Sequence, residues 1–397
     1  MKRRDFLTHS TLASTLFLVP NFVKGFEKLA KKSLLDKKLV IIQLSGGNDG
    51  LNTVVPYNND IYYNKRPTIS IPKNKVIKLT DELGFHQLLT PLKSLYDQGY
   101  VSIINNVGYP NPDRSHFRST DIWQTASDAN EYLNTGWVGR YIEKYGRKAY
   151  SGIEIDDSLS LIMKGKNING IATKNPRALF VNTQAPYFKN LINYQSDAHL
   201  SEHNLGYLYK TMIEAKSSAK YIYEKHKTQT STKRYPQNPF GKQLKTTAEF
   251  INSRLKTNVF YVSMGGFDTH ANQTMRQNNL LTTFGKALEI FVNDLKQHDT
   301  FRDTLIVVFS EFGRRLQQNA ARGTDHGAAN NVFVIGENLK KKGFYNEAPN
   351  LMCLDSNEDL IHSVDFRSIY ATVLKRWLCA DDRAILNKSF NYLDFIR

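Results

Sequence analysis

Five short runs of apolar residues recur along the chain, separated by longer amphipathic stretches. They are LVIIQL (39–44), VSII (101–104), NVFYVSM (258–264), TLIVVF (304–309) and NVFVIG (331–336). Runs that are apolar at almost every position are typical of strands buried on both faces of a parallel sheet. The stretch 281–299 instead places apolar residues such as Phe284 and Leu288 at helical spacing. This alternation predicts an α/β fold, a doubly wound and mostly parallel sheet with helices on both faces.

The composition limits the classes of protein that this chain can be. Of its 397 residues, 41% are hydrophobic and 12% are aromatic, which indicates a globular protein. The net charge is +16, but the lysines are spread along the chain and form no compact basic and aromatic motif. We therefore expect a basic surface suited to anionic substrates, and no nucleic acid as a partner. The two cysteines, Cys353 and Cys379, are too few for a cysteine-rich zinc module, although one bridge between them stays open.

The first 25 residues have the features of an export signal. Arg3 and Arg4 precede Phe6-Leu7 and a short, weakly apolar run that ends near Pro20. This order resembles a twin-arginine signal, which predicts recognition by the twin-arginine export machinery and a location in the periplasm or cell envelope. Because no clear cleavage site with small residues follows, retention of residues 1–25 as an N-terminal anchor stays open.

The rest of the chain, residues 36–397, is expected to form one domain, because large α/β enzymes fill this size range as a single elaborated domain. Residues 185–250 are polar, aromatic and helical in pattern, so we expect a helical cap or insertion there. Beyond the N-terminus no apolar stretch reaches about 18 residues, and no internal transmembrane span is expected.

Residues able to bind metals or anions follow the predicted strands. They are Asp49 after the first run, Asp113, Ser115, His116 and Arg118 after the second, Asp268 and His270 after the third, Glu311, Arg314 and Arg315 after the fourth, and Asp325 and His326 just ahead of the fifth. Ligands of open parallel sheets bind at the carboxyl ends of the strands. Convergence of these clusters predicts a metal site. Carboxylates and imidazoles without thiolate favour one or two ions of Zn²⁺ or Mn²⁺ over Ca²⁺ or Mg²⁺.

The order of these motifs is similar to that of the DUF1501 family, which belongs to the alkaline phosphatase and sulfatase superfamily. The motifs that carry the resemblance are QLSGGNDGLNTVVPY, RSHFRSTDIWQTA, GWVGRY, GGFDTH, SEFGRR and GTDHG, which span residues 39 to about 340. The resemblance implies an alkaline phosphatase-like fold. It also implies a carboxylate metal ligand after the first strand, a nucleophile at a helix N-terminus, and later Asp and His residues that complete a two-metal site.

The resemblance implies two groups of metal ligands. They are Asp268, His270 and His326 for one ion, and Asp49 and Glu311 for the second. Asp325 would either bind metal directly or orient His326. For Asp49 an alternative stays open, because Asn48-Asp49-Gly50 is also good turn chemistry.

By the same resemblance, Ser115 would be the nucleophile, since it lies where a helix could begin and a helix N-terminus stabilises negative charge. A serine at that position can equally be a helix N-cap, so both interpretations stay open. His116 and Arg118 would contact the substrate anion or the metal. Arg314 would hold a phosphate or sulfate oxygen through two hydrogen bonds.

Departures from alkaline phosphatases concern the second ion. Those enzymes carry Asp-His where this chain has Glu311-Phe312, and the Asp and His of their other pair stand further apart than Asp268 and His270. A second ion would therefore be weakly held or absent. The sequence predicts an exported, metal-dependent hydrolase of a phosphate or sulfate ester with a serine nucleophile. The alternative is a non-catalytic, metal-containing binding or scaffold protein of the cell envelope.

Overall fold

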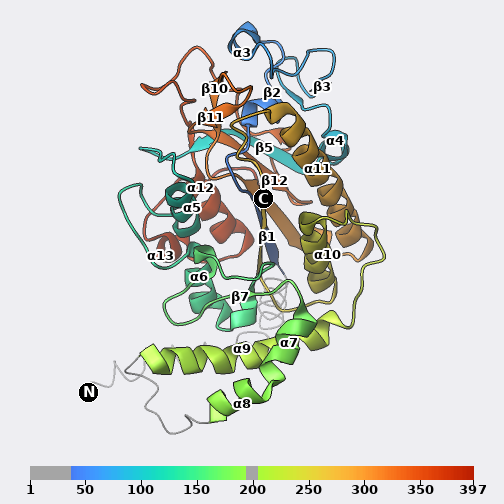
Figure 1. Cartoon of the computed structure of the whole chain (residues 1–397), viewed down its shortest axis with the longest axis vertical. Coiled ribbons are helices and arrows are strands. Elements are labelled where there is room, and N and C mark those ends of the chain that lie inside the picture. Colours follow the sequence, from blue (N-terminus) through green and yellow to red (C-terminus); the bar gives the residue numbers. More distant parts are fainter. Residues whose placement is uncertain (1–36, 194–203) are drawn as a thin grey trace, which may run out of the picture.

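The computed structural model describes residues 37–193 and 204–397, so the predicted signal at 1–25 lies outside the described residues. Its centre is a sheet in the order β13-β5-β12-β9-β1-β8-β6-β7, with β14 paired to β5 (Figure 1). The strands are β1 (Lys38–Leu44), β5 (Val101–Gly108), β6 (Gly152–Glu154), β7 (Ile171–Ala172), β8 (Val259–Met264), β9 (Thr304–Phe309), β12 (Asn330–Ile335), β13 (Gly343–Phe344) and β14 (Val364–Asp365). Within this sheet all pairings except those of β12 are parallel, which confirms the predicted α/β fold with a mostly parallel sheet.

The fifth apolar run forms β12, and its predicted parallel orientation is wrong. β12 runs antiparallel to both of its neighbours, β5 and β9. The chain enters it from the hairpin of β10 (Arg314–Gln318) and β11 (Thr324–His326), which ends close to the start of β12. A parallel strand would need a crossover of about a dozen residues or more to return to the opposite edge. Residues just ahead of β12 therefore lie at the same edge as residues that follow the parallel strands.

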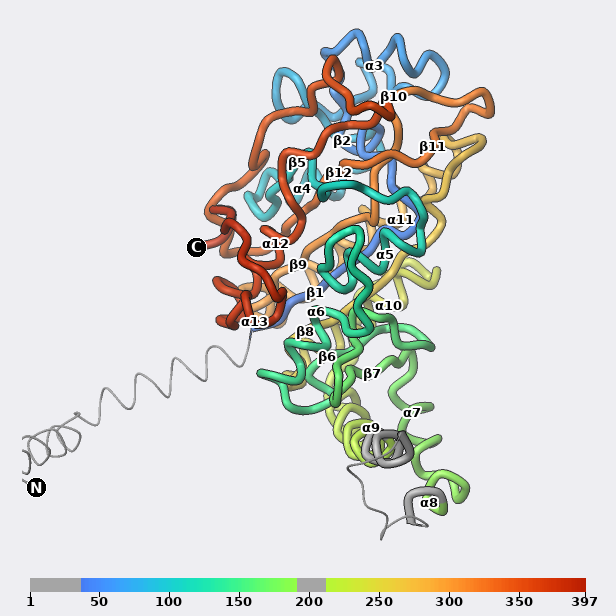
Figure 2. The backbone as a smooth tube through the Cα atoms, turned by 90° about the vertical axis from the view of Figure 1, so that its left-hand side faces the viewer, coloured from blue at the N-terminus to red at the C-terminus, as the bar shows by residue number. Residues whose placement is uncertain are grey.

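Helices cover both faces of the sheet, as predicted. One face carries α4 (Thr90–Asp97), α10 (Pro239–Asn252) and α11 (Gln273–Gln297), and the other carries α5 (His116–Thr125), α6 (Trp137–Tyr141), α12 (Phe366–Thr372) and α13 (Asp382–Leu386) (Figure 1, Figure 2). β1 contributes to both cores, with Val40 and Ile42 in the first and Leu39 and Ile41 in the second. Successive side chains of a strand face opposite sides, so a strand covered on both faces is apolar throughout.

Residues 185–250 contain several helices, which lie in two places. α10 packs into the core, where Leu244 and Ile251 are buried. α8 (Pro186–Asn193) and α9 (Asn204–His226) lie with α7 (Pro176–Gln184) at the opposite end of the molecule from β10 and β11 (Figure 1). Helices α7 to α9 thus stand away from the sheet edge that carries the candidate ligands.

A smaller sheet of β2 (Val54–Val55), β4 (Gly84–Phe85) and β3 (Ile77–Lys78) lies with α3 (Asp60–Lys65) beyond the carboxyl edge of the main sheet (Figure 1). Within the described ranges, no helix is long and apolar enough to cross a membrane. Cys353 and Cys379 are both exposed and free, so the bridge that the sequence left open does not form.

Candidate metal centre

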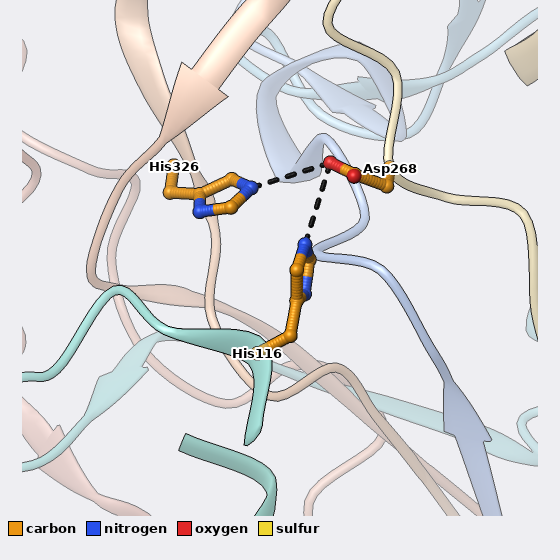
Figure 3. Close-up of side chains that lie close together, drawn as sticks. All are labelled: His116, Asp268 and His326. Carbon is orange, nitrogen blue, oxygen red and sulfur yellow. Dashed lines mark hydrogen bonds and ion pairs between the residues drawn. The ribbon is translucent and has the colours of Figure 1, made fainter. Parts of the chain in front are cut away.

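Three imidazole rings and one carboxylate meet at the carboxyl edge of the sheet. His116 begins α5, Asp268 lies in the loop after β8, and His326 ends β11 (Figure 3). Ligand atoms of these three residues all lie within 4.8 Å of one another. Asp268 Oδ1 lies 3.4 Å from His116 Nε2 and 3.2 Å from His326 Nε2. The third ring, His270, places its Nε2 atom 3.0 Å from the same oxygen and 2.9 Å from His326 Nε2.

The Nδ1 atom of each ring forms a hydrogen bond to an oxygen atom of the protein. The acceptors are the Arg114 carbonyl for His326 (2.7 Å), Glu311 Oε1 for His116 (2.9 Å) and Asp325 Oδ1 for His270 (3.1 Å). A carbonyl or an ionised carboxylate can only accept a hydrogen bond, so each Nδ1 atom carries a proton. In the neutral ring the Nε2 atom then has a lone pair, and all three lone pairs face Asp268. Such backing is typical of histidines that bind a metal.

The electrostatics favour the cation-binding forms of Asp268 and His326, but they favour protonation of His116. Partial burial opposes ionisation of Asp268, but the hydrogen bond and the positive charge of Arg314 hold its pKa well below the usual range. Burial lowers the pKa of His326, whereas the hydrogen bond to Glu311 raises the pKa of His116. An ionised Asp268 and a neutral His326 are the protonation states that metal binding requires.

Glycines permit the turn of the loop GGFDTH and its close packing against the β10–β11 hairpin. Gly266 has φ +105°, a conformation that residues with a side chain rarely adopt. Gly323 packs so closely on the backbone of the loop that a Cβ atom would overlap the carbonyl oxygen of His270. The amide of Thr324 also donates to the carbonyl of Thr269 (3.3 Å). The loop and the hairpin therefore form one connected platform for the ligands.

Phe312 packs between two of the candidate ligand rings. It is buried, and its ring centroid lies 4.8 Å from that of His116 and 4.6 Å from that of His326. Phe312 thus supports two ligand rings by packing. His116 was expected to contact the substrate anion or the metal. Its place beside Asp268 depends on the path of the chain after β5, for which the sequence holds no local signal.

Arg314 is engaged within the protein. Its Nε atom donates to the Gly47 carbonyl (2.7 Å), and Nη1 donates to the Thr324 carbonyl (2.8 Å). Its Nη2 atom donates to the Phe267 carbonyl (3.1 Å) and to Asp268 Oδ1 (2.7 Å). The side chain is fully buried. The structure therefore places Arg314 beneath Asp268, where it joins three loops, and not where it could hold a substrate oxygen.

Arg118 also lies outside the candidate centre. Its Nη2 atom donates to the carbonyls of Ala129 (2.9 Å) and Glu131 (2.6 Å), and its guanidinium stacks on Tyr132 at 3.9 Å from the ring centroid. These contacts fix the segment after α5. They give Arg118 a structural role in place of the predicted contact with substrate or metal.

Asp49 is buried in an ion pair. Its Oδ2 atom lies 2.6 Å from Nη1 of Arg66, and both side chains are almost fully buried. Its Oδ1 atom accepts from the Asn52 amide (3.3 Å) and so caps the short helix Gly50–Asn52. The structure thus matches the turn alternative and does not bring Asp49 into the group around Asp268.

The remaining carboxylates orient histidines. Glu311, whose side chain is 1% exposed, accepts from His116 Nδ1, from the Gly46 amide (2.7 Å) and from Gln43 Nε2 (3.2 Å). Asp325 accepts a hydrogen bond from His270. The expectation that Asp325 orients His326 is therefore wrong. Both residues proposed for a second ion, Asp49 and Glu311, are thus held by donors of the protein, and the described residues contain one candidate centre.

Ser115 is the N-cap residue of α5, directly before His116, and it is exposed. Its amide donates to Asp113 Oδ1 (2.7 Å), but its hydroxyl makes no capping hydrogen bond to this helix. Ser115 therefore occupies the N-cap position, but its hydroxyl does not cap the helix.

A cavity of about 780 Å³ lies away from the candidate centre, between Asn106 and the segment 341–363.

The sheet and the residues at its carboxyl edge define an α/β protein with a histidine and carboxylate centre. The chain belongs to the DUF1501 family, described as a protein of unknown function, whose family model matches residues 99–388. No curated protein matches the sequence.

Solved structures with a similar fold include members of the alkaline phosphatase and sulfatase superfamily. PsFucS1 sulfatase from Pseudoalteromonas sp. is 10% identical, with 94% of this chain and 73% of that chain covered and a TM-score of 0.43. A protein in the alkaline phosphatase superfamily from Vibrio parahaemolyticus is 11% identical, with 89% and 70% covered and a TM-score of 0.38. The lipoteichoic acid synthase LtaP from Listeria monocytogenes is 10% identical, with 78% and 68% covered and a TM-score of 0.38.

Proposed function

We propose that this protein is a metal-dependent hydrolase of phosphate or sulfate esters, and that His116, Asp268, His270 and His326 hold one divalent cation. The observation that carries the proposal is the convergence of three Nε2 lone pairs on one carboxylate oxygen, at 3.0 to 3.4 Å. Each ring is fixed in that orientation by the acceptor on its Nδ1 atom. This arrangement is open at the surface, because the Asp268 side chain is 47% exposed.

The donor set fits a cation of the size of zinc. Ligand atoms at about 2.1 Å from a tetrahedral ion are separated by roughly 3.4 Å, close to the separations around Asp268 Oδ1. The Nε2 atoms of His270 and His326, 2.9 Å apart, would repel each other if both were unprotonated and no cation lay near them. Nitrogen and oxygen ligands without thiolate favour Zn²⁺ or Mn²⁺.

A divalent cation bound here would polarise an ester oxygen and stabilise the negative charge that develops on it. The chain's own residues would hold the reacting groups in place. Arg314 keeps Asp268 ionised, and Glu311 and Asp325 orient their histidines. Ser115, with its hydroxyl uncommitted to the helix, is the proposed nucleophile, and a water molecule is the alternative attacking group.

The proposed location is the periplasm or cell envelope, reached through the twin-arginine export machinery. The arginine pair Arg3-Arg4 supports this proposal. The basic net charge of +16 suits an anionic ester, either free or borne on a polymer.

A second candidate is a metal-containing binding or scaffold protein without turnover. The observation that favours it is the engagement of Arg118 and Arg314 by carbonyl groups, because a hydrolase of anionic esters usually needs a cationic side chain that faces its substrate.

Two measurements on the purified full chain separate these candidates. Elemental analysis tests the cation, and a screen of aryl phosphates and aryl sulfates tests turnover. Metal with turnover that is lost in His326→Ala supports the hydrolase. Metal without turnover on either ester class supports the binding protein. A folded wild-type protein that binds neither Zn²⁺ nor Mn²⁺ contradicts both.

A further inference from the structure

One buried amide joins the two loops that carry the candidate ligands. Gln273, the first residue of α11, is fully buried. Its Oε1 atom accepts from the hydroxyl of Thr269 (3.2 Å) and from the hydroxyl of Thr324 (2.6 Å). Its Nε2 atom donates to Asp49 Oδ2 and to Gln277 Oε1 (3.3 Å).

The two threonines stand next to the proposed ligands in the chain. Thr269 lies between Asp268 and His270, and Thr324 lies two residues before His326. Both are buried, at 2% and 0% exposed, so water does not compete for their hydroxyls. A single oxygen atom of Gln273 thus links the side chains of the loop after β8 and the β10–β11 hairpin, in addition to the backbone bond from Thr324 to Thr269.

The orientation of this amide is fixed from its other side. Asp49 is held by Arg66 at 2.6 Å and can only accept hydrogen bonds, so the Gln273 nitrogen must face Asp49. The amide oxygen must then face the two hydroxyls. A flipped amide would set its oxygen against the carboxylate with no proton between them, which is unfavourable in a buried site.

We infer that Gln273 is a positioning residue for the cation, acting through Thr269 and Thr324, and that the Asp49–Arg66 pair fixes the direction in which it acts. The inference rests on the proposed metal centre. Partners of this kind typically alter metal affinity about 10–100-fold when they are removed. It also gives Asp49 a role in the centre without direct contact with the ion.

Titration of the metal-free full chain with Co²⁺ tests the inference, because the visible absorption of Co²⁺ reports its coordination geometry as well as its affinity. Thr269→Val/Thr324→Val removes both hydroxyls at nearly constant volume. We expect Co²⁺ to bind at least about tenfold more weakly, with a changed spectrum. Thr269→Ser/Thr324→Ser keeps both hydroxyls and should restore the wild-type spectrum. The control is Thr304→Val, a buried threonine at the amino end of β9.

The outcomes distinguish this inference from the proposed function. Wild-type protein that binds neither Co²⁺ nor Zn²⁺ overturns the metal centre and the inference together. Wild-type affinity and spectrum in the folded double valine variant overturn the inference alone. If the double variant does not fold, the single variant Thr269→Val gives the same reading, with an intermediate loss expected and an unchanged spectrum counting against Gln273.

Discussion

Asp268 Oδ1, the oxygen that three imidazoles face, also lies 2.7 Å from Nη2 of Arg314. The Arg314 side chain is fully buried, whereas that of Asp268 is 47% exposed. The guanidinium therefore approaches from inside the protein and leaves the outer side of the carboxylate to the rings. Arg314 can fix Asp268 without occupying the place where a cation would bind.

Replacing Arg314 by lysine should weaken cation binding as well as stability. Lysine keeps the charge, but its single nitrogen cannot reach the carbonyls of Gly47 and Thr324 while it holds Asp268. We expect a lower melting temperature and a dissociation constant for Zn²⁺ raised at least about tenfold, measured against a competing chelator below the melting transition. Arg118→Lys is the control, since it also breaks bonds to carbonyls but should leave Zn²⁺ binding unchanged. Equal losses in the two variants would point to a general effect on stability.

Removal of one proposed ligand should abolish stabilisation by metal. At a Zn²⁺ concentration of 100 times its dissociation constant, wild-type protein should gain about 2.7 kcal/mol in its free energy of unfolding. His326→Ala should gain almost nothing, because the remaining donors no longer enclose the ion. His362→Ala, which removes an imidazole outside the group, should keep the full shift. Thermal melts with and without Zn²⁺ give the result, and an undiminished shift in His326→Ala would refute the ligand assignment.

Ser115 can be tested as nucleophile because its hydroxyl does not cap α5. Ser115→Ala should therefore cost less stability than the about 0.5–2 kcal/mol typical of a lost N-cap. If Ser115 attacks the ester, the same variant should lose turnover by several orders of magnitude, since no attacking oxygen remains. Ser115→Asp should also fold, and it should be as inactive as Ser115→Ala because it too lacks the serine hydroxyl. Turnover near the wild-type rate in folded Ser115→Asp would exclude the serine and leave water as the attacking group.

Glu154 should make stability depend on pH. Burial raises the pKa of its carboxyl to about 7 from an ordinary value of 4.5. Between these values the folded protein holds a proton that the unfolded chain has lost, so the free energy of unfolding falls as pH rises through this range and levels off above about 7. Glu154→Gln should remove this loss and exceed the wild type at pH 8 by up to roughly 3 kcal/mol. Glu82→Gln, an exposed control, should not. The free energy of unfolding is measured by denaturant titration at several pH values. The same pH dependence in wild type and Glu154→Gln would contradict the effect.

Export should depend on the arginine pair and not on positive charge as such. Replacing Arg3-Arg4 by two lysines preserves the charge but removes the feature that the twin-arginine machinery recognises. We expect the variant to accumulate in the cytoplasm, as shown by cell fractionation. Its metal binding after purification should match that of the wild type, which controls for folding. Unchanged export of the double-lysine variant would mean that another route carries the protein.

The sequence predicts the main sheet well because a strand buried on both faces appears as a continuous apolar run. Every residue of β1 is buried, and the apolar run is visible without knowledge of its neighbours. The direction of β12 cannot be predicted in this way, because an apolar run is the same in a parallel and in an antiparallel strand. Direction depends on the short connection from His326, which the hairpin of β10 and β11 produces.

The candidate centre is only partly predictable for a related reason. Asp268 and His326 follow from their motifs and from the rule that strand ends meet. The same rule could not separate ligands from carboxylates that are already paired. Arg66, which neutralises Asp49, follows α3 and belongs to none of the motifs. Likewise, Glu311 turns toward His116 because the Gly46 amide and Gln43 hold it there.

The insertion of β12 between β5 and β9 has a consequence for the chain as it is synthesised. β5 joins the rest of the main sheet through β12, and their contact at Asn105 and Asn331 is separated by 226 residues. Until residues 330–335 emerge, β5 and β9 each present an apolar edge with unpaired backbone groups, and such edges pair readily with other chains. This topology therefore favours aggregation of unfinished chains. A chaperone that shields residues 101–108 during translation should reduce that aggregation more than one that acts after release.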